Sequence, residues 1–180
     1  VSDGEPEMSA VKAAAETVAE QAGERETLVV VSSTVYPGGT SEVVAPLIST
    51  DRPDESTRFA MVPERLNPGG DHAIGDIPLV VGADDPAARD AAQTLFGSIT
   101  ETVPVASTET AELSKTLENT YRMVNIALVN QLVALAEQLD ADVWRAIDAA
   151  GTKPFGFQSF EPGPGVGGHC IPIDPQFLMW

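Results

Sequence analysis

The sequence predicts an α/β protein in which a mostly parallel sheet is followed by a mainly helical region with one long helix. Over the first 106 residues, short runs of β-branched residues alternate with helical segments, which is the pattern of a parallel sheet with crossover helices. From about residue 107, apolar residues recur in steps of three and four, which indicates one amphipathic helix of roughly thirty residues. The chain has 180 residues, of which 43% are hydrophobic, and this is enough to form a sizeable core.

The predicted strands and helices of the first region follow in regular order. An alanine-rich helix is expected at 7–22, because alanine has the highest helix propensity and Gly23 can end it. The continuous β-branched run at 27–33 predicts a strand buried on both faces. Further strands are expected at 58–62, 78–82 and 101–105, and further helices near 40–49 and 86–97.

The long helix is expected to begin at Ser107 or Thr108, either of which can cap it. Glu109 and Glu112 suit the positive end of the helix dipole in its first turns. A helix of this length is expected to run between domains or to line a subunit interface. Its apolar stripe comprises positions 113, 117, 121, 124, 128, 132, 135 and 139, and further helices are expected at 142–150 and from 174 to 180.

The chain is strongly acidic, with 27 Asp and Glu against 10 Lys and Arg and a net charge of −17. Such a charge repels nucleic acid and anionic membranes, so neither is expected as a partner. The acidity fits either a solvated surface or adaptation to high salt, and the scarcity of lysine favours the second. We therefore expect the melting temperature, followed by circular dichroism, to rise with molar salt. A melting temperature that does not rise would contradict halophilic adaptation.

Composition also predicts a cytoplasmic protein. No apolar run approaches the roughly eighteen residues of a membrane span, and the first residues do not resemble a secretory signal. A single cysteine excludes an internal disulfide and fits a reducing compartment. A metal site is not expected, because His72, His169 and Cys170 are the only soft ligands.

The stretch at 162–175 is rich in glycine and proline and is expected to be a loop outside any helix or strand. Its Cys170 is a candidate nucleophile, although free cysteines are most often small buried hydrophobes, and the thiol alone leaves the two interpretations about evenly balanced. Thr34 and Glu64 follow predicted strands, where ligand groups gather in parallel sheets. Lys115 and Asn119 are four residues apart on one side of the long helix, a spacing that solvated residues also show.

Five motifs follow one another along the chain: S-T-V-Y-P-G (33–38), P-E-R-L-N-P-G (63–69), A-E-L-S-K-T-L-E-N (111–119), N-I-A-L-V-N-Q-L (125–132) and G-G-H-C-I-P-I-D (167–174). In this order they resemble the nucleotide-sugar 6-dehydrogenases, the family containing UDP-glucose dehydrogenase and GDP-mannose dehydrogenase. His169 and Ile173 stand where the UDP-glucose and GDP-mannose enzymes usually have serine and lysine. With K-P-F-G-F at 153–157, they resemble the branch that oxidises UDP-N-acetylhexosamines, such as UDP-N-acetylmannosamine or UDP-N-acetylglucosamine.

The resemblance implies that residues 1–106 are the later half of a Rossmann-like NAD-binding domain and that residues 107–180 are an incomplete helical central domain. The family's C-terminal nucleotide-sugar-binding domain has no counterpart in the chain, and no G-x-G-x-x-G turn follows a predicted strand. The chain is therefore expected to be an internal part of a family member. It is expected to form a homodimer through the long helix at 108–139.

The implied activity is the NAD-dependent, four-electron oxidation of the C6 hydroxyl of a UDP-N-acetylhexosamine to the uronic acid, for surface polysaccharide or glycan precursors. Cys170 would form a thiohemiacetal and then a thioester. Lys115 would supply the cation that favours the thiolate, and it would also stabilise an oxyanion, to which Asn119 would donate a hydrogen bond. Two alternatives stay open, namely a UDP-glucose or GDP-mannose substrate, and an inactive folded fragment that acts only as a dimerisation core.

The resemblance also assigns supporting roles around this cysteine. Glu64 would help to activate water for thioester hydrolysis, and Asp174 would orient that water or the lysine. Thr34 and Glu64 would lie beside NAD. Substrate contacts are expected from Arg65, Leu66, Asn67, Lys153, Gly163, Gly165, Gly167 and Gly168.

Overall fold

The structure is a computed structural model that describes residues 6–22, 25–50, 56–66, 69–168 and 170–179. By packing, the chain divides into two compact units. We call residues 1–117 with 176–180 the sheet unit, and residues 118–175 the helical unit. The predicted domain boundary at 106/107 stays a prediction. By packing, the first turns of the long helix, up to residue 117, belong to the sheet unit.

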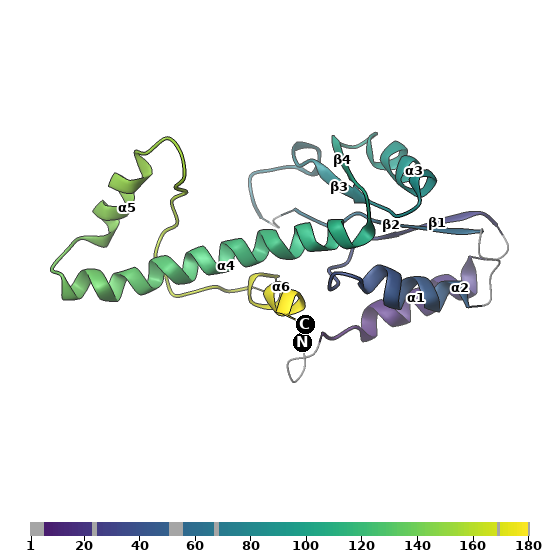
Figure 1. Cartoon of the computed structure of the whole chain (residues 1–180), viewed down its shortest axis with the longest axis horizontal. Coiled ribbons are helices and arrows are strands. Elements are labelled where there is room, and N and C mark those ends of the chain that lie inside the picture. Colours follow the sequence, from purple (N-terminus) through teal and green to yellow (C-terminus); the bar gives the residue numbers. More distant parts are fainter. Residues whose placement is uncertain (1–5, 23–24, 51–55, 67–68, 169, 180) are drawn as a thin grey trace. The chain divides into compact units, whose positions relative to one another are not determined.

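The sheet unit contains a four-stranded sheet in the order β1-β2-β3-β4 (Figure 1). β1 and β2 are parallel, and so are β3 and β4. β2 and β3 are antiparallel and meet at Met61 and Gly82. The predicted α/β class with a mostly parallel sheet is confirmed, with one antiparallel step inside it. The strands are Thr27–Val31, Thr57–Met61, Leu79–Gly82 and Thr102–Val105.

Helix α1 precedes β1, and the helices η1, α2, η2 and α3 occupy the connections between these strands. The segment after β1 forms a π-helix that continues directly as α2, where the sequence predicts one short helix. Asp85 caps α3 by accepting a hydrogen bond from the Ala87 amide, and Pro86 occupies its first turn, where no partner for an N–H is needed. Gly23, the predicted end of α1, lies outside the described residues. The bounds are α1 Ser9–Gln21, η1 Thr40–Val44, α2 Ala45–Ser49, η2 Ile74–Asp76 and α3 Pro86–Phe96.

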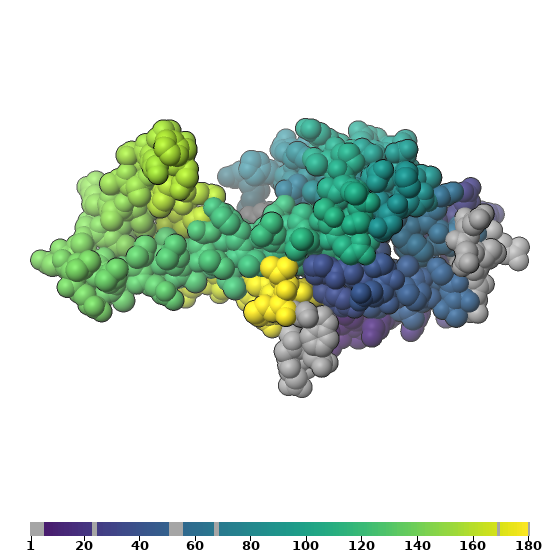
Figure 2. Space-filling view, viewed as in Figure 1, coloured from purple at the N-terminus to yellow at the C-terminus, as the bar shows by residue number. Residues whose placement is uncertain are grey.

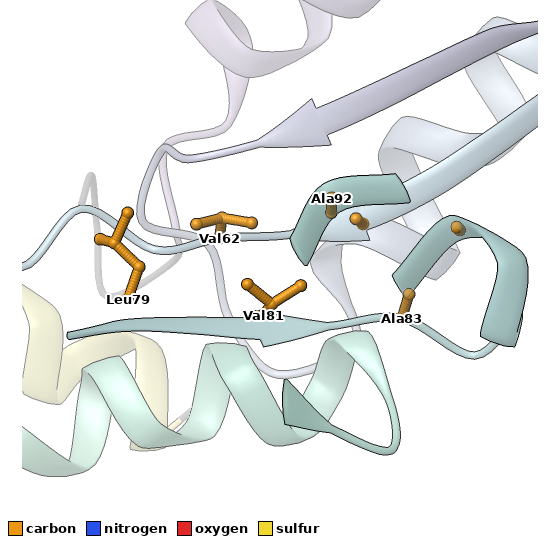
Figure 3. Packing of buried hydrophobic residues seen from close by; sticks show 7 residues of the cluster. Val62, Leu79, Val81, Ala83 and Ala92 are labelled. Carbon is orange, nitrogen blue, oxygen red and sulfur yellow. The ribbon is translucent and has the colours of Figure 1, made fainter. Parts of the chain in front are cut away.

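One buried apolar cluster of the sheet unit lies between the sheet and α3, while other buried apolar side chains come from α1, η1 and α2. The cluster's larger side chains come from the β2 end and β3, and they face small alanines of α3 (Figure 3). Because alanine has only a methyl side chain, α3 can lie close against the strands, and Leu28, Val30 and Phe96 pack against the cluster. The cluster comprises Ala60, Val62, Leu79, Val81, Ala83, Ala88 and Ala92.

The long helix α4 (Thr108–Gln138) begins in the sheet unit and packs its first turns against β3. The contact depends on Gly82, because a Cβ atom there would lie 2.3 Å from the Ser107 carbonyl oxygen and 2.7 Å from the Ala111 Cβ. Both distances are shorter than van der Waals contact, so the backbones would have to separate. The face of α4 that is buried in these turns is mostly polar and comprises Thr108, Ala111, Glu112 and Thr116.

The apolar stripe of α4 lies on another face and stays exposed along the whole helix. Its eight side chains retain between 38% and 67% of their accessible surface. The space-filling view shows α4 (green) contributing to the outer surface (Figure 2). Exposed apolar stripes of this length mark surfaces that associate with another chain, so the subunit-interface prediction stays open.

The helical unit contains the rest of α4, α5 (Val143–Gly151) and an irregular segment that leads to α6 (Cys170–Met179). Asp142 caps α5 by accepting hydrogen bonds from two backbone amides. The irregular segment is tied to α4 by three contacts. The Tyr121 hydroxyl donates to Gln158 at 3.0 Å, the Tyr121 ring meets Phe160 edge-on at 6.0 Å, and the Gly163 amide donates to the Asn130 side chain at 2.8 Å.

Helix α6 corrects the prediction of a loop through residues 162–175 followed by a helix from 174. The helix begins at Cys170, four residues earlier. Pro172 is tolerated because the first amides of a helix have no partner within it, while Pro175 lies inside the helix and removes one of its hydrogen bonds. The prolines, interpreted as helix breakers, are the reason for the error.

No helix in the described part of the chain combines the length and the apolar character that crossing a membrane requires.

Candidate active site

Thr34 and Glu64 follow the carboxyl ends of two neighbouring parallel strands, as predicted. The β1–β2 ladder continues beyond both strands, because the Val62 amide donates to Val31 at 2.9 Å and the Glu64 amide donates to Ser32 at 3.2 Å. Thr34, two residues after Ser32, is half-buried, and Glu64 is exposed. The structure therefore holds the backbones that carry these two residues at the same edge of the sheet.

The segment after Glu64 is braced by its own polar groups. The Glu64 carboxylate accepts a hydrogen bond from the Leu66 amide at 2.5 Å, and the Arg65 guanidinium donates to the Pro78 carbonyl at 2.6 Å. Arg65 thus has a clear structural partner, and its predicted contact with substrate stays a prediction. Leu66 is half-buried, and Asn67 lies outside the described residues.

Lys115 is a half-buried residue of α4 in the sheet unit. Ala111, one turn earlier on the same helix, packs against Gly82 of β3, so this part of the helix has a fixed position on the sheet. The sheet unit therefore holds three of the predicted catalytic residues, Thr34, Glu64 and Lys115, on one packed framework.

Glu112 is a functional candidate that the sequence does not single out. Its side chain is fully buried, and its two oxygens accept hydrogen bonds from the Gly38 amide at 2.6 Å and the Thr40 amide at 2.8 Å. Burial raises the pKa of Glu112 above the ordinary glutamate value of 4.5, against the opposing effect of these hydrogen bonds. From the sequence, Glu112 is only a favourable residue near the helix start, because nothing in its spacing signals burial.

We expect Glu112 to make the stability of the protein fall as pH rises. Because its pKa is raised in the folded state, the folded protein binds more protons than the unfolded chain between pH 4.5 and the raised value. The free energy of unfolding, relative to a Glu112→Gln variant, should therefore decrease through this window and level off above it. The loss is about 1.4 kcal/mol for each tenfold change in proton affinity.

Urea unfolding of both proteins from about pH 4, below the unfolded pKa of 4.5, up to about pH 8 measures this difference. The titratable groups that face Glu112 are Glu109 on the same helix and Tyr36 in the facing segment. Burial raises the pKa of Tyr36, and the nearby carboxylates of Glu42 and Glu112 raise it further. A difference between wild type and variant that is constant with pH would contradict the prediction.

The helical unit holds the second set of predicted catalytic residues. Cys170 is exposed as the first residue of α6, and Asp174 lies one helical turn later with 4% of its surface exposed. The Asn119 side-chain amide donates a hydrogen bond to the Asp174 carboxylate at 2.5 Å. The structure therefore brings Asn119 and Asp174 together, with Cys170 on the same helix as Asp174. His169 lies outside the described residues.

The glycines before Cys170 leave open space beside the backbone. Gly165 and Gly168 have φ values of +108° and +80°, which favour glycine for conformational reasons. A Cβ atom at any of the four glycines 163, 165, 167 and 168 would meet no atom within 4 Å. Their letters fit G-x-G-x-x-G, but an irregular segment precedes them instead of a strand, so the context of a dinucleotide-binding turn is missing.

Lys153, another predicted substrate contact, is exposed, and its ammonium lies 4.7 Å from the centre of the Phe155 ring. This cation–π contact holds the side chain near the irregular segment of the helical unit. Its predicted contact with substrate stays a prediction.

The residues at the carboxyl ends of β1 and β2 fit one end of NAD. A hydroxyl at Thr34 and a carboxylate at Glu64 suit the polar carboxamide and ribose of the nicotinamide half. None of the four strands is followed by a glycine-rich G-x-G-x-x-G turn, so the pyrophosphate has no such site after β1–β4. The predicted contacts of Thr34 and Glu64 with NAD stay predictions.

Comparison with known proteins agrees with this geometry. Residues 1–100 match the model of the UDP-glucose/GDP-mannose dehydrogenase family, NAD binding domain, and residues 109–180 match the central domain of the same family. A UDP-N-acetyl-D-mannosamine dehydrogenase of Methanocaldococcus jannaschii is 36% identical over 158 residues, which are 87% of this chain and 36% of that protein. A UDP-N-acetyl-D-glucosamine 6-dehydrogenase of Pseudomonas aeruginosa is 38% identical, over 84% of this chain and 37% of that protein.

Solved structures give the same result. The structure of a UDP-D-ManNAc dehydrogenase from Pyrococcus horikoshii matches with a TM-score of 0.86 and 34% identity, over 99% of this chain and 43% of that one. The chain spans well under half the length of the relatives it matches. The predicted resemblance and the predicted cofactor are confirmed at the level of the family: the chain belongs to the UDP-glucose/GDP-mannose dehydrogenases, a family of NAD-dependent nucleotide-sugar oxidoreductases.

Proposed function

We propose that the protein carrying this chain oxidises the C6 hydroxyl of a UDP-N-acetylhexosamine to a carboxylate through a covalent intermediate on Cys170. The observation that carries this proposal is the exposed thiol at the start of α6, with Asp174 one turn later bonded to Asn119. The matched relatives named for UDP-N-acetylmannosamine and UDP-N-acetylglucosamine support the sugar class. A free thiol nucleophile also needs a reducing compartment, which supports a cytoplasmic site of action.

The chemistry explains why a thiol is needed. NAD, when bound, accepts one hydride in each of the two oxidations. The aldehyde formed first has no hydride to give until a nucleophile adds to its carbonyl carbon. The Cys170 sulfur forms that bond as the carbonyl oxygen takes a proton, giving a thiohemiacetal. Loss of the C6 hydride and the hydroxyl proton gives a thioester. Water then attacks the thioester, the C–S bond breaks, and the products are the carboxylate and the free thiol.

The remaining residues would stabilise the charges that develop in these steps or transfer protons. The Lys115 ammonium would stabilise the thiolate and the oxyanion, and the Asn119 amide would donate to the same oxygen. Glu64 would accept a proton from the attacking water, which Asp174 would orient. The proposal requires the predicted catalytic residues of the sheet unit and those of the helical unit to act in one site. This requirement is supported by the five sequence motifs, which occur in the order found in the family.

An assay with NAD and a panel of nucleotide sugars tests the proposal. UDP-N-acetylmannosamine or UDP-N-acetylglucosamine should give two NADH for each uronic acid formed, measured by absorbance and mass spectrometry. A preference for UDP-glucose or GDP-mannose would overturn the sugar class while leaving the thioester chemistry intact. NADH formation with none of the panel, in the protein at its natural length, would overturn the activity.

We also propose that a second copy of the chain covers the exposed face of α4 in the helical unit. This face borders an apolar groove of about 820 Å³ between α4, α5 and the segment at 156–160. Large exposed apolar surfaces of this kind mark protein interfaces, which also favours the dimerisation-core alternative for a chain without activity. The groove includes Tyr121, Leu128, Leu132, Leu135, Leu139, Ile147 and Phe160.

A charge in the middle of this face should separate the dimer. We expect Leu132→Glu to give a monomer at micromolar concentration by size-exclusion chromatography with light scattering, because burying an unpaired carboxylate opposes association. Ala134→Glu adds the same charge at an exposed position of α4 outside the stripe and should leave the dimer intact. A monomeric wild-type protein would contradict the proposed interface.

A further inference from the structure

Glu112 lies at a position where a charge is costly. It is fully buried, and the ion pairs found in the described part of the chain involve Arg58 and not this carboxylate. Burying a carboxylate without a cation costs free energy, and hydrogen bonds offset only part of the cost. An apolar side chain of similar volume would fill the same space without that cost. Packing alone therefore gives no reason for a glutamate at this position.

The hydrogen bonds of Glu112 give such a reason. They come from the Gly38 and Thr40 amides at the start of η1, and they span 74 and 72 residues of sequence. Amides at a helix start have no partners within the helix, and Gly39, the residue before η1, has no side chain that could cap it. Glu112 supplies both acceptors from another helix, with one carboxylate oxygen for each amide.

The turn that Glu112 holds lies in the segment 34–40, which follows β1 and begins with Thr34. It contains two consecutive glycines, and Gly38 has a φ of +102°, a conformation that other residues rarely adopt. Glycines add backbone freedom, so such a turn needs an external tie to keep one conformation. Glu112 is fixed in turn, because Ala111 next to it packs against Gly82 of β3. Lys115 lies three residues further along the same helix.

We propose that Glu112 is a positioning residue that clamps the turn after β1 and so fixes Thr34 relative to the segment of α4 that carries Lys115. The roles of Thr34 and Lys115 rest on the proposed function. The clamp itself rests only on the burial of Glu112 and its two hydrogen bonds. Its carboxyl group offers one oxygen to each of the two amides, whereas a glutamine side chain has only one acceptor oxygen.

Glu112→Gln is the sharpest test, because glutamine has the same shape but turns an NH₂ group toward one of the two amides. Glu109→Gln is the matched control. Glu109 lies one turn earlier on α4 and also contacts the η1 start, where it accepts a hydrogen bond from the Ser41 hydroxyl at 2.8 Å, but it does not bond to either amide. The two variants make the same chemical change on the same helix.

Amide hydrogen exchange over residues 34–44, followed by mass spectrometry in the protein at its natural length, reports the clamp directly. We expect Glu112→Gln to speed exchange at Gly38 and Thr40 about tenfold, the effect of losing one hydrogen bond of ordinary net strength. Glu109→Gln and Cys170→Ser should exchange there like wild type. Wild-type exchange in Glu112→Gln would overturn the clamp, whatever the enzyme does.

Kinetics separate positioning from stability. At a temperature where all variants are folded, Glu112→Gln should lower kcat about tenfold with little change in KM for the nucleotide sugar, because Thr34 is displaced. An unchanged kcat beside faster exchange would overturn the positioning role and leave a purely structural clamp. A wild-type protein without turnover would contradict the proposed function. The exchange rates at Gly38 and Thr40 would still show whether Glu112 clamps the turn.

Discussion

Replacing Cys170 by serine should abolish formation of the uronic acid while leaving nucleotide-sugar binding nearly unchanged. Serine preserves the size of the side chain, and Cys170 is exposed at the start of α6, so the fold should not respond. An alcohol is a much poorer nucleophile than a thiolate, so the aldehyde cannot be captured for the second oxidation. We expect acid formation to fall on the order of a thousandfold or more, as is usual for loss of a covalent nucleophile.

The measurement is the number of NADH formed for each sugar, together with mass spectrometry of the products. Binding of the UDP-sugar, followed by calorimetry, should change less than about threefold, which corresponds to well under 1 kcal/mol. Glu137→Gln, at an exposed residue of the same unit with no predicted role in the site, serves as a control for handling and stability. Turnover to the acid at the wild-type rate by Cys170→Ser would exclude the thioester route.

Replacing Gly82 by alanine should strongly destabilise the sheet unit, although it adds only one methyl group. The added Cβ would lie 2.3 Å from the Ser107 carbonyl oxygen, so β3 and the start of α4 would have to move apart. Overpacking of this kind, with a backbone atom as the obstacle, costs about 1–3 kcal/mol or more. Urea unfolding of the wild type and the variant measures the loss.

Gly75→Ala is the matched control for this substitution. A Cβ atom at Gly75 would lie 3.6 Å from the Ile99 carbonyl oxygen, which is an ordinary contact, and the residue has no left-handed backbone. Its free energy of unfolding should change by less than about 0.5 kcal/mol, as for most surface substitutions. Equal stability of Gly82→Ala and Gly75→Ala would show that α4 is not held against β3 as the structure indicates.

The regular elements follow closely from local signals. The β-branched run at 27–33 contains β1, the alanine-rich segment contains α1, and Asp142 caps the helix predicted at 142–150. The steps of three and four define α4 to within a residue or two at each end. These signals are local, because propensity, caps and periodicity act within a few residues of one another. Thr34 and Glu64 lie where parallel strands end for the same reason.

Features that depend on contacts between distant residues were not predictable. The amphipathic pattern of α4 predicts contact with another domain or subunit, but it carries no signal that the polar face with Thr108, Glu112 and Thr116 is buried within the chain. The antiparallel pairing of β2 with β3 depends on the path of the chain between the two strands, and no local sequence pattern indicates that path. Glycine and proline around Cys170 suggested a loop, although Pro172 is compatible with the first turn of a helix.

The close approach of Gly82 to the start of α4 has a consequence for how this protein can be divided. The family's two domains meet between residues 100 and 109, yet the residues that complete the first of them lie beyond that point. A piece ending at residue 106 would lose Ala111 from the surface of β3 and would leave the Gly38 and Thr40 amides without acceptors. The NAD-binding domain is thus completed by about three turns of α4 that belong to the next domain in sequence. The two are therefore not interchangeable modules, and even a cut after residue 117 would remove residues 176–180, which pack in the sheet unit.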